Sequence, residues 1–237
     1  MKVLEFDIKK GIFHLEINDL NVDKHSHPAL EIINAKKGRF SVETKFGKQN
    51  NLTFAIIDAN LNHKMVSEQN EIEFLLIECN STKLKEFLFM RGIETKNGIF
   101  TSTELTNRVE LIEDLLNFSA TQNLKHTNDK RIYNCIEIIE TENLPYNKLM
   151  ATLTSKILLS ESRLSHLFTE NVGISIKKYH VWNKLKFALK FFLSEETNLK
   201  EASFEAEFFD QAHLSNAFKN YLGINPSKVF NSRTLQL

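Results

Sequence analysis

Cysteine, proline and glycine are all scarce in this sequence, which has 2 Cys, 3 Pro and 7 Gly among its 237 residues. Because Cys79 and Cys135 are far apart in the chain, we expect no disulfide framework and a reducing compartment. So little proline and glycine argues against long disordered or repetitive segments. The chain is long enough for two modest folded domains, each with its own core.

Long apolar runs are missing as well. No stretch approaches the ~20 apolar residues that a membrane-spanning helix needs. Residues 1–10 have no apolar run after their first basic residue, so they do not resemble a signal peptide. We therefore expect a cytoplasmic protein with no membrane partner.

Net charge is also absent, because 30 Lys and Arg balance 30 Asp and Glu. The charge is distributed unevenly, with a net +2 over residues 131–237 and −2 over residues 1–130. This asymmetry has the sign expected for a DNA-binding C-terminal half, but it is small. Any argument for DNA binding must therefore come from local patterns.

The first 80 residues have the pattern of an all-β domain. Short segments rich in β-branched and aromatic residues alternate with turn signals such as Lys37-Gly38 and Asn50-Asn51. The predicted strands are 3–8, 11–17, 29–35, 39–46, 52–58 and 71–78. Their regular spacing predicts a barrel or sandwich.

After residue 80 the hydrophobic period becomes helical. Helices are predicted at 81–89 and 103–118, a polar linker at 121–129, and further helices at 130–142, 148–157, 161–170, 176–193, 199–207 and 211–221, with a last turn near 227–230. The fold class is therefore α+β with two domains. We divide the chain into a β-barrel sensor at 1–80, a helical dimerisation and linker region at 81–129, and an all-α DNA-binding domain at 130–237.

The predicted helix at 103–118 has one apolar face. Leu105, Val109, Ile112 and Leu116 follow one another at steps of four, three and four. This face suits packing against the barrel. It equally suits pairing with a second copy, as in a short coiled coil, which would make the protein a homodimer.

Residues 153–168 have the pattern of a helix-turn-helix unit. A helix ends near Ile157, and Ser160 is placed to cap the next one. Leu164, Leu167 and Phe168 then face inward. Short polar side chains on the opposite face are suited to hydrogen bonding with base edges in a major groove. The candidate DNA-binding residues of this helix are Glu161, Ser162, Arg163, Ser165 and His166.

A second, similar unit follows. Asp210 is a suitable cap, Leu214 and Phe218 face inward, and Gly223 ends the helix. The candidate DNA-binding residues here are Gln211, Ala212, Ser215, Asn216 and Lys219. Since Leu164 and Leu214 are fifty residues apart, we expect the two helices to lie about one DNA turn, ~34 Å, apart.

Both units resemble the AraC/XylS family of transcription regulators, in family order across about 100 residues. The matching positions are Ser160, Leu164, Phe168, Gly173, Ser175 and Tyr179, then Phe208, Asp210, Gln211, His213, Ser215, Phe218, Lys219, Gly223 and Pro226. The resemblance implies sequence-specific binding to double-stranded DNA, a small-molecule effector in the N-terminal barrel, and RNA polymerase as a further candidate partner.

Four positions depart from the family pattern. Glu207 replaces the usual glycine, so that turn must be held without it, and Phe230 replaces a tyrosine. Ala212 replaces a serine and Asn216 an arginine, which removes a phosphate or base contact. We therefore expect the second unit to bind DNA more weakly than the first, or mainly to position it.

A histidine-rich segment precedes these helices. His25, His27 and Glu31 would share one face of a strand, and His63 lies on a later strand or turn. Three histidines and a carboxylate suit Zn, Fe, Mn or Ni. The segment resembles the first cupin motif, although the glycine before the histidine pair is missing and Ala59-Asn60 stands where the second motif carries proline. Regulator barrels that inherit the cupin fold without a metal fit the segment as well.

Two functions compete at this stage. The leading hypothesis is a ligand-responsive DNA-binding regulator that is not an enzyme and requires no cofactor. The alternative is a metal-dependent cupin enzyme, such as an isomerase or dioxygenase, or a metal sensor, with a divalent metal held by His25, His27, Glu31 and His63. No Ser-His-Asp grouping, P-loop or Gly-rich dinucleotide turn supports another enzyme class. The sequence identifies neither the effector nor the operator, and does not separate activator from repressor.

Overall fold

The computed structural model describes residues 2–18, 20–67, 70–79, 82–125, 127, 129–142, 144–194 and 198–226. By their contacts these residues form two units. The first consists of Met1–Lys125 together with Lys219–Leu237, and the second of His126–Phe218. The last turn predicted near 227–230, and Phe230 within it, lie outside the described residues.

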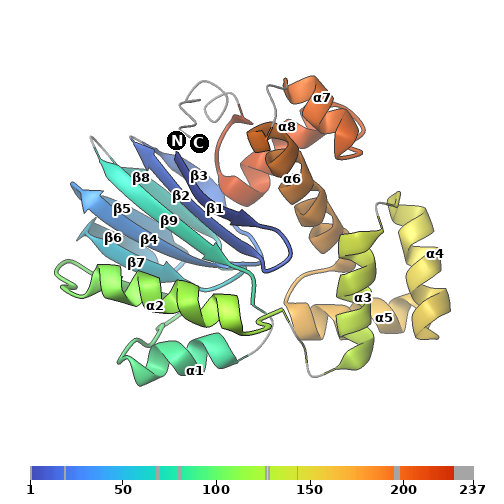
Figure 1. The fold of residues 1–237 in the computed structure, drawn as a ribbon, viewed down its shortest axis with the longest axis horizontal. Coiled ribbons are helices and arrows are strands. Elements are labelled where there is room, and N and C mark those ends of the chain that lie inside the picture. The colour runs from blue at the N-terminus through green and yellow to red at the C-terminus, as the bar shows by residue number, and fades with distance from the viewer. Residues whose placement is uncertain are drawn as a thin grey trace. The chain divides into compact units, whose positions relative to one another are not determined.

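The first unit is built around two antiparallel sheets (Figure 1). The larger has the strand order β1-β2-β9-β4-β7-β10 and the smaller the order β3-β8-β5-β6. The strands are β1 (Lys2–Asp7), β2 (Ile12–Asn18), β3 (Val22–His25), β4 (Leu30–Lys37), β5 (Phe40–Thr44), β6 (Gly47–Leu52), β7 (Phe54–Ile57), β8 (His63–Ser67), β9 (Glu71–Ile77) and β10 (Ile99–Ser102).

Strand β4 lies near the middle of the larger sheet, between β7 and β9. Glu31 is opposite Ile57 on one side and Leu76 on the other, so the register of both neighbours is fixed along its length. Ile32 and Ile33 point to opposite faces and both are fully buried. Burial of both faces explains why this strand does not alternate between apolar and polar residues, and why its Glu31 and Asn34 are buried as well.

Helices α1 (Lys83–Met90) and α2 (Arg108–Thr121) lie along one face of the larger sheet (Figure 1). Their buried residues join sheet residues in a single core. Leu111, Ile112 and Leu115 form the buried face of α2, whereas Val109 is 66% exposed. Of the apolar face predicted from the sequence, Ile112 belongs to this core and Leu105 and Leu116 pack against it, so most of that face lies on the sheet and Val109 lies outside it. Pairing with a second copy stays a prediction.

The structure adds strands β6 and β10, which the sequence pattern did not predict, and it places His25 and His63 on the short strands β3 and β8. Strand β10 falls in the region expected to be helical, where it pairs antiparallel with β7 and extends the larger sheet. Short strands of this kind are stabilised by their pairing partners, so their own residues carry little local signal.

The described part of the second unit is all-α, and the last described helix, α8, begins in this unit and ends in the first. The helices are α3 (Lys130–Thr141), α4 (Tyr146–Ile157), α5 (Glu161–Val172), α6 (Ile176–Ser194), α7 (Leu199–Glu205) and α8 (Gln211–Leu222). One core joins α3, α4, α5 and the start of α6. The expected sheet-rich N-terminal and helical C-terminal regions are confirmed. Among the described residues, no helix combines the length and apolar character that crossing a bilayer requires.

Candidate DNA-binding helices and a buried histidine cluster

The turn between α4 and α5 is fixed by local backbone chemistry. Helix α4 ends at Leu158, which adopts a left-handed conformation with φ of 59° and donates its N–H to the Thr154 carbonyl. Two residues later the Ser160 hydroxyl accepts a hydrogen bond from the Arg163 N–H, 3.4 Å away. This confirms Ser160 as the N-cap of α5 and sets the direction in which that helix leaves the turn.

Helix α5 has one buried and one exposed side. Leu164 and Phe168 are fully buried, and Gly173 ends the helix in a left-handed conformation. On the opposite side lie the predicted DNA-binding residues: Glu161, Ser162, Arg163 and His166 are exposed, and Ser165 is half-buried. The outer face is therefore open to a partner, and its contact with DNA remains a prediction.

Helix α8 follows the same plan. The Asp210 carboxylate accepts a hydrogen bond from the His213 N–H at 2.7 Å, and Leu214 and Phe218 are buried. The predicted DNA-binding residues again lie outside: Gln211, Ala212, Asn216 and Lys219 are exposed, and Ser215 is half-buried. The Ser215 hydroxyl donates to the Gln211 carbonyl at 2.8 Å, so its donor is already used within the helix.

Glu207 lies in the turn between α7 and α8, where the sequence pattern lacks its usual glycine. Its φ is 55°, which is the left-handed region that an ordinary residue adopts only at a cost. Lys184 on α6 donates to the Glu207 carbonyl at 2.7 Å, and its ammonium lies 3.9 Å from the Glu207 carboxylate. Lys184 thus helps to hold the turn, a role that no local sequence signal indicated.

Buried polar side chains of α6 connect this helix to Glu140 on α3. The Tyr179 hydroxyl donates to Glu140 Oε1 at 2.8 Å, and Lys186 Nζ lies 3.4 Å from the same oxygen. Next to them His180 is buried, and this burial, together with the nearby Lys184 ammonium, lowers the pKa of the imidazole to about 4. The contacts of Tyr179 and Lys186 with Glu140 position the two helices, and His180 is buried in its neutral form on the same helix as Tyr179 and Lys186.

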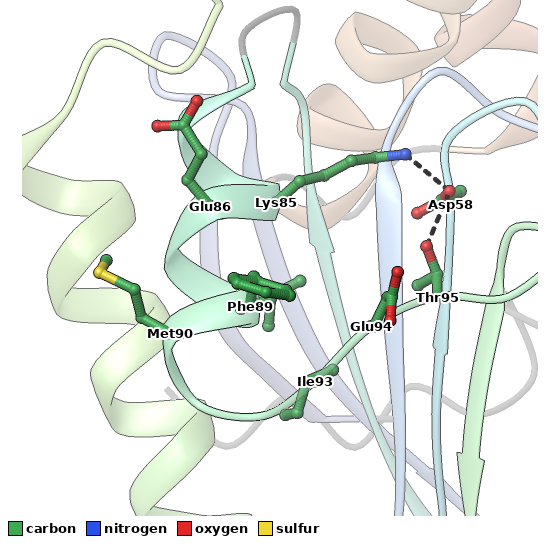
Figure 2. Close-up of a pocket in the computed structure, with 9 residues that line it drawn as sticks. Asp58, Lys85, Glu86, Phe89, Met90, Ile93, Glu94 and Thr95 are labelled. Carbon is green, nitrogen blue, oxygen red and sulfur yellow. Dashed lines mark hydrogen bonds and ion pairs between the residues drawn. The ribbon is translucent and has the colours of Figure 1, made fainter.

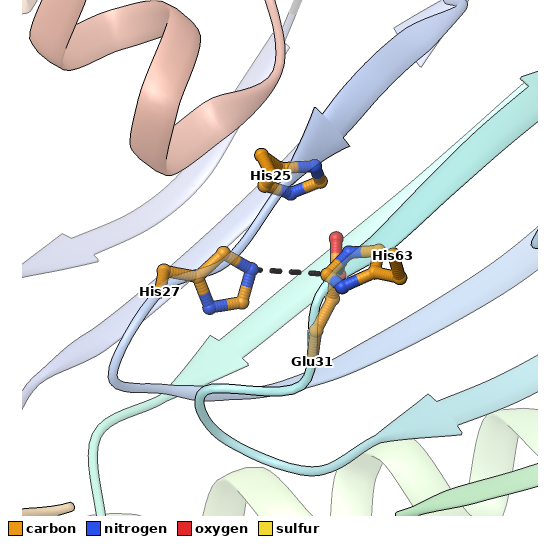
Figure 3. Close-up of side chains that lie close together, drawn as sticks. All are labelled: His25, His27, Glu31 and His63. Carbon is orange, nitrogen blue, oxygen red and sulfur yellow. Dashed lines mark ion pairs between the residues drawn. The ribbon is translucent and has the colours of Figure 1, made fainter. Parts of the chain in front are cut away.

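The four candidate ligand residues of the N-terminal domain do come together (Figure 3). His25 is the last residue of β3, Glu31 lies on β4, and His63 begins β8. His27 lies in the loop beyond β3, so the prediction that both histidines share one strand is wrong, and the loop turns the second ring back toward the first. All four residues are at most 5% exposed.

Each imidazole is held from behind by a backbone carbonyl. The Nδ1 atoms donate to Asp23 O at 2.9 Å from His25, to Ala29 O at 3.1 Å from His27, and to Leu61 O at 2.9 Å from His63. A carbonyl can only accept, so in the neutral rings the proton is on Nδ1 and the Nε2 atom carries a lone pair. Glu31 Oε2 lies 2.7 Å from His63 Nε2 and 3.5 Å from His27 Nε2.

Burial and mutual proximity shift the ionisation of the cluster. Burial and the neighbouring His63 and His27 rings lower the pKa of His25 to about 3. Burial alone would raise the pKa of the Glu31 carboxyl, but His63 and His27 outweigh it and hold that pKa well below its usual range. Burial likewise opposes protonation of His63, yet Glu31 raises the pKa of its ring. The Glu31 carboxylate and the His63 ring thus each favour the charged form of the other.

A separate, open pocket of about 580 Å³ lies between α1 and the segment that follows it (Figure 2). Lys85 and Thr95 both bind the Asp58 carboxylate, at 2.8 and 3.1 Å, and Phe89 and Met90 provide an apolar wall. None of the site residues predicted from the sequence lines it. Sequence reasoning missed this pocket because its residues come from three separate segments without a shared motif.

Known proteins resemble the chain in both of its parts. A family model described as a helix-turn-helix domain matches residues 153–232. The Msm operon regulatory protein of Streptococcus mutans is 33% identical over 76 residues, which are 32% of this chain and 27% of that protein. The arabinose operon regulatory protein of Escherichia coli is 26% identical over 144 residues, 60% of this chain and 49% of that protein. The matches thus span about half or less of these relatives.

Solved structures of ToxT from Vibrio cholerae resemble the whole fold. An apo form of a variant with one substituted residue aligns with a TM-score of 0.61 at 12% identity, covering 94% of this chain and 98% of that one. A form bound to an unsaturated fatty acid aligns with a TM-score of 0.58 at 13% identity, covering 94% and 95%. At this identity the likeness establishes the two-domain fold.

Proposed function

We propose that this chain is a sequence-specific DNA-binding regulator of transcription of the AraC/XylS type, because a helix-turn-helix family model matches its C-terminal helices and an operon regulator is among its relatives. One observation carries the proposal. Within the matched residues, α5 and α8 are each capped by a side chain at the N-terminus, buried on one side and polar on the other. A polar helix face with a free N-terminal end is suited to insertion into a major groove.

The first helix-turn-helix unit is the one we expect to select the DNA sequence. Arg163 and His166 on α5 are exposed side chains with donors that reach beyond the helix surface. An arginine can donate two hydrogen bonds to a guanine edge, which gives about 1–3 kcal/mol of discrimination. Glu161, Ser162 and Ser165 flank them on the same helix and complete the proposed contact face.

The second unit is proposed to contribute position more than sequence choice. Ala212 offers no hydrogen bond, Ser215 is already engaged with Gln211, and Asn216 is a short neutral side chain. Lys219 is the residue of this face suited to a phosphate, and Gln211 to a base edge or phosphate. The DNA affinity of the second unit should therefore be less sensitive to sequence.

We further propose that a small effector binds the N-terminal domain of this chain; a ToxT structure of similar fold was solved with an unsaturated fatty acid bound. We also propose that the chain forms a homodimer and contacts RNA polymerase. The proposed location is the cytoplasm, because a regulator of transcription works where the DNA is. Exposed apolar Phe89, Met90 and Val109 on α1 and α2 support a surface for a second copy.

The test is to select bound duplexes from a random pool at stated salt, and then to measure Kd for the selected site with Arg163→Ala/His166→Ala. We expect Kd to rise at least tenfold and the sequence preference at the contacted position to relax. Lys48→Ala is the control, because Lys48 is an exposed residue of β6 outside the proposed contact face. This variant should leave the Kd and the sequence preference unchanged. If the double variant keeps wild-type affinity and preference, α5 is not the recognition helix.

A further inference from the structure

The proposed function gives no role to the buried cluster of His25, His27, Glu31 and His63. Their ligand atoms all lie within 4.8 Å of one another. Burying four polar side chains of this kind is costly unless their charges and lone pairs are compensated. Glu31 Oε2 and His63 Nε2 form an ion pair at 2.7 Å, and His27 Nε2 lies 3.5 Å from the same oxygen. A single carboxylate thus faces two imidazoles, and a bound cation would compensate the whole set.

The orientation of the rings is that of metal ligands (Figure 3). Because each Nδ1 donates to a backbone carbonyl, the Nε2 atoms are the ones that can ligate a metal, and those of His27 and His63 lie 3.5 and 2.7 Å from Glu31 Oε2. Metal-binding histidines are characteristically held in this way, with the second nitrogen donating to a carbonyl or carboxylate that fixes tautomer and ring orientation. The cluster therefore offers three nitrogen lone pairs and one anionic oxygen, and no donor on its inner side when neutral.

These ligands favour one class of cation. Mg²⁺ and Ca²⁺ prefer oxygen ligands, whereas three imidazoles and a carboxylate suit a divalent first-row transition metal. Ligands on opposite sides of such a cation are about 4.2 Å apart, given metal–ligand distances of about 2.1 Å. The ligand atoms of the cluster lie within 4.8 Å of one another, which is close to that separation. Small side-chain shifts would therefore bring all four within bonding distance of one cation.

A strand of this site also contacts the end of α8, inside the first unit. The Asp23 N–H donates to the Gly223 carbonyl at 2.8 Å, and the Ser26 N–H donates to the Asn220 carbonyl at 3.3 Å. Gly223 has φ of +64°, and a Cβ there would overlap the Asp23 carbonyl and lie 2.8 Å from His25 Nδ1. The backbone that presents His25 is therefore packed directly on the last turn of the proposed second recognition helix.

We infer that His25, His27, Glu31 and His63 bind a divalent transition-metal cation, and that this cation is an effector of the regulator proposed above, on whose DNA-binding function the second step rests. The cation would fix the end of β3, and β3 would act on α8 through Asp23 and Gly223. An effector can change DNA affinity only as far as it favours one state of this contact over another.

The first experiment asks whether the metal binds. The full-length chain is stripped with a chelator and titrated with Co²⁺, whose visible absorption reports nitrogen and oxygen coordination. We expect saturation at one equivalent, competition by Zn²⁺, and a higher melting temperature on loading. His63→Gln and His27→Gln should each weaken Co²⁺ binding at least about 100-fold, more than the loss typical for an outer-shell change.

His14→Gln is the matched control. His14 is buried in the same domain and contacts Glu73 at 2.8 Å, outside the cluster. It should bind Co²⁺ like the wild type. The titration of the wild type decides the question even if a variant folds poorly. A wild-type chain without a saturable Co²⁺ spectrum would overturn the metal site while leaving the DNA-binding proposal intact.

The second experiment measures Kd for the selected duplex with one equivalent of Zn²⁺ and with chelator. We expect the two values to differ at least about fivefold in the wild type and in His14→Gln, the lower end of measured coupling between sites. The ratio should fall to about one in His63→Gln. It should also fall in Gly223→Ala, whose Cβ displaces the β3 backbone at Asp23 and crowds His25, so the Co²⁺ affinity of this variant is measured beside its two Kd values.

The outcomes separate the two steps. Equal Kd values in a chain that takes up Co²⁺ would overturn the effector role and leave the metal site standing. An unchanged ratio of the two Kd values in Gly223→Ala would contradict the route through α8. Absence of DNA binding under every condition would refute the proposed function, and the Co²⁺ titration would still decide the site.

Discussion

The barrel and the helical domain use polar side chains in opposite ways. In the barrel, His25, His27, Glu31 and His63 are buried and converge on one point. In the helical domain the candidate residues of α5 and α8 lie outside and diverge over two helix surfaces. The first arrangement suits a small cation, which must be desolvated and surrounded. The second suits an extended polyanion, which is contacted along its length.

The difference also explains which region needs exact long-range geometry. The cluster draws its ligands from β3, the loop after it, β4 and β8, so it exists only when the strands have the observed register. Each recognition helix needs only its own cap and its own buried face. An exposed helix face can therefore be recognised from a short stretch of sequence, whereas the buried cluster depends on the whole sheet.

The largest predicted effect tests whether the two regions fold as separate units. Phe168→Ala removes a fully buried ring from the core of α3 to α6, and should lower the free energy of unfolding of the helical domain by about 3–5 kcal/mol. Fluorescence of Trp182, the only tryptophan of the sequence, and calorimetry would measure it. The barrel transition should remain where it is in the wild type.

Phe54→Ala is the reciprocal variant, because Phe54 is fully buried in the core that joins the barrel to α1 and α2. It should destabilise the barrel by a similar amount and leave the Trp182 transition in place. Movement of both transitions in both variants would mean that the two units unfold as one cooperative body.

An intermediate effect comes from His180, whose pKa is lowered from its ordinary 6.5 to about 4 chiefly by burial. Because the unfolded chain takes up the proton first, the stability that depends on neutral His180 is present above pH 6.5 and is lost as pH falls toward 4. We expect the helical domain to lose about 2 kcal/mol between pH 7.5 and pH 5, measured by denaturant titration of Trp182 fluorescence.

His180→Gln should remove most of that pH dependence. His166→Gln is its control, since the His166 side chain is 84% exposed and should leave the slope unchanged. Parallel stability curves for His180→Gln and the wild type would show that the slope has another source.

How much the sequence predicts follows the same division between local and long-range structure. Ser160, Asp210 and Gly223 are recognised from the sequence because a cap or a helix end is decided within a few residues. The helices of the second unit were predicted within a few residues of their observed ends for the same reason. The strand β10 was missed, since it is defined by pairing with β7 rather than by its own composition.

The candidate site shows both limits. The histidines and Glu31 were selected by residue type, but the position of His27 beyond the strand depends on the loop. The ion pair of Lys186 with Glu140, and the contact of Gly223 with β3, join residues far apart in the chain. Such contacts leave no periodic signal, so only the folded structure reveals them.

The smallest predicted effect concerns Glu207 and is a gain. Its φ of 55° costs an ordinary residue about 1–2 kcal/mol, whereas glycine adopts it freely. Glu207→Gly keeps the carbonyl that accepts from Lys184 and loses only a half-exposed carboxylate, worth little at the surface. After the entropy that glycine adds to the unfolded chain, the net stabilisation should be about 0.5–1 kcal/mol.

Glu205→Gly, in the last turn of α7, supplies the opposite case and should destabilise by about 0.5–1 kcal/mol, because a helical residue gains nothing from the wider φ range. Denaturant titration of Trp182 fluorescence compares the two variants. Equal destabilisation by both would mean that the turn before α8 carries no strain, and that the second unit loses nothing by lacking the glycine of its family.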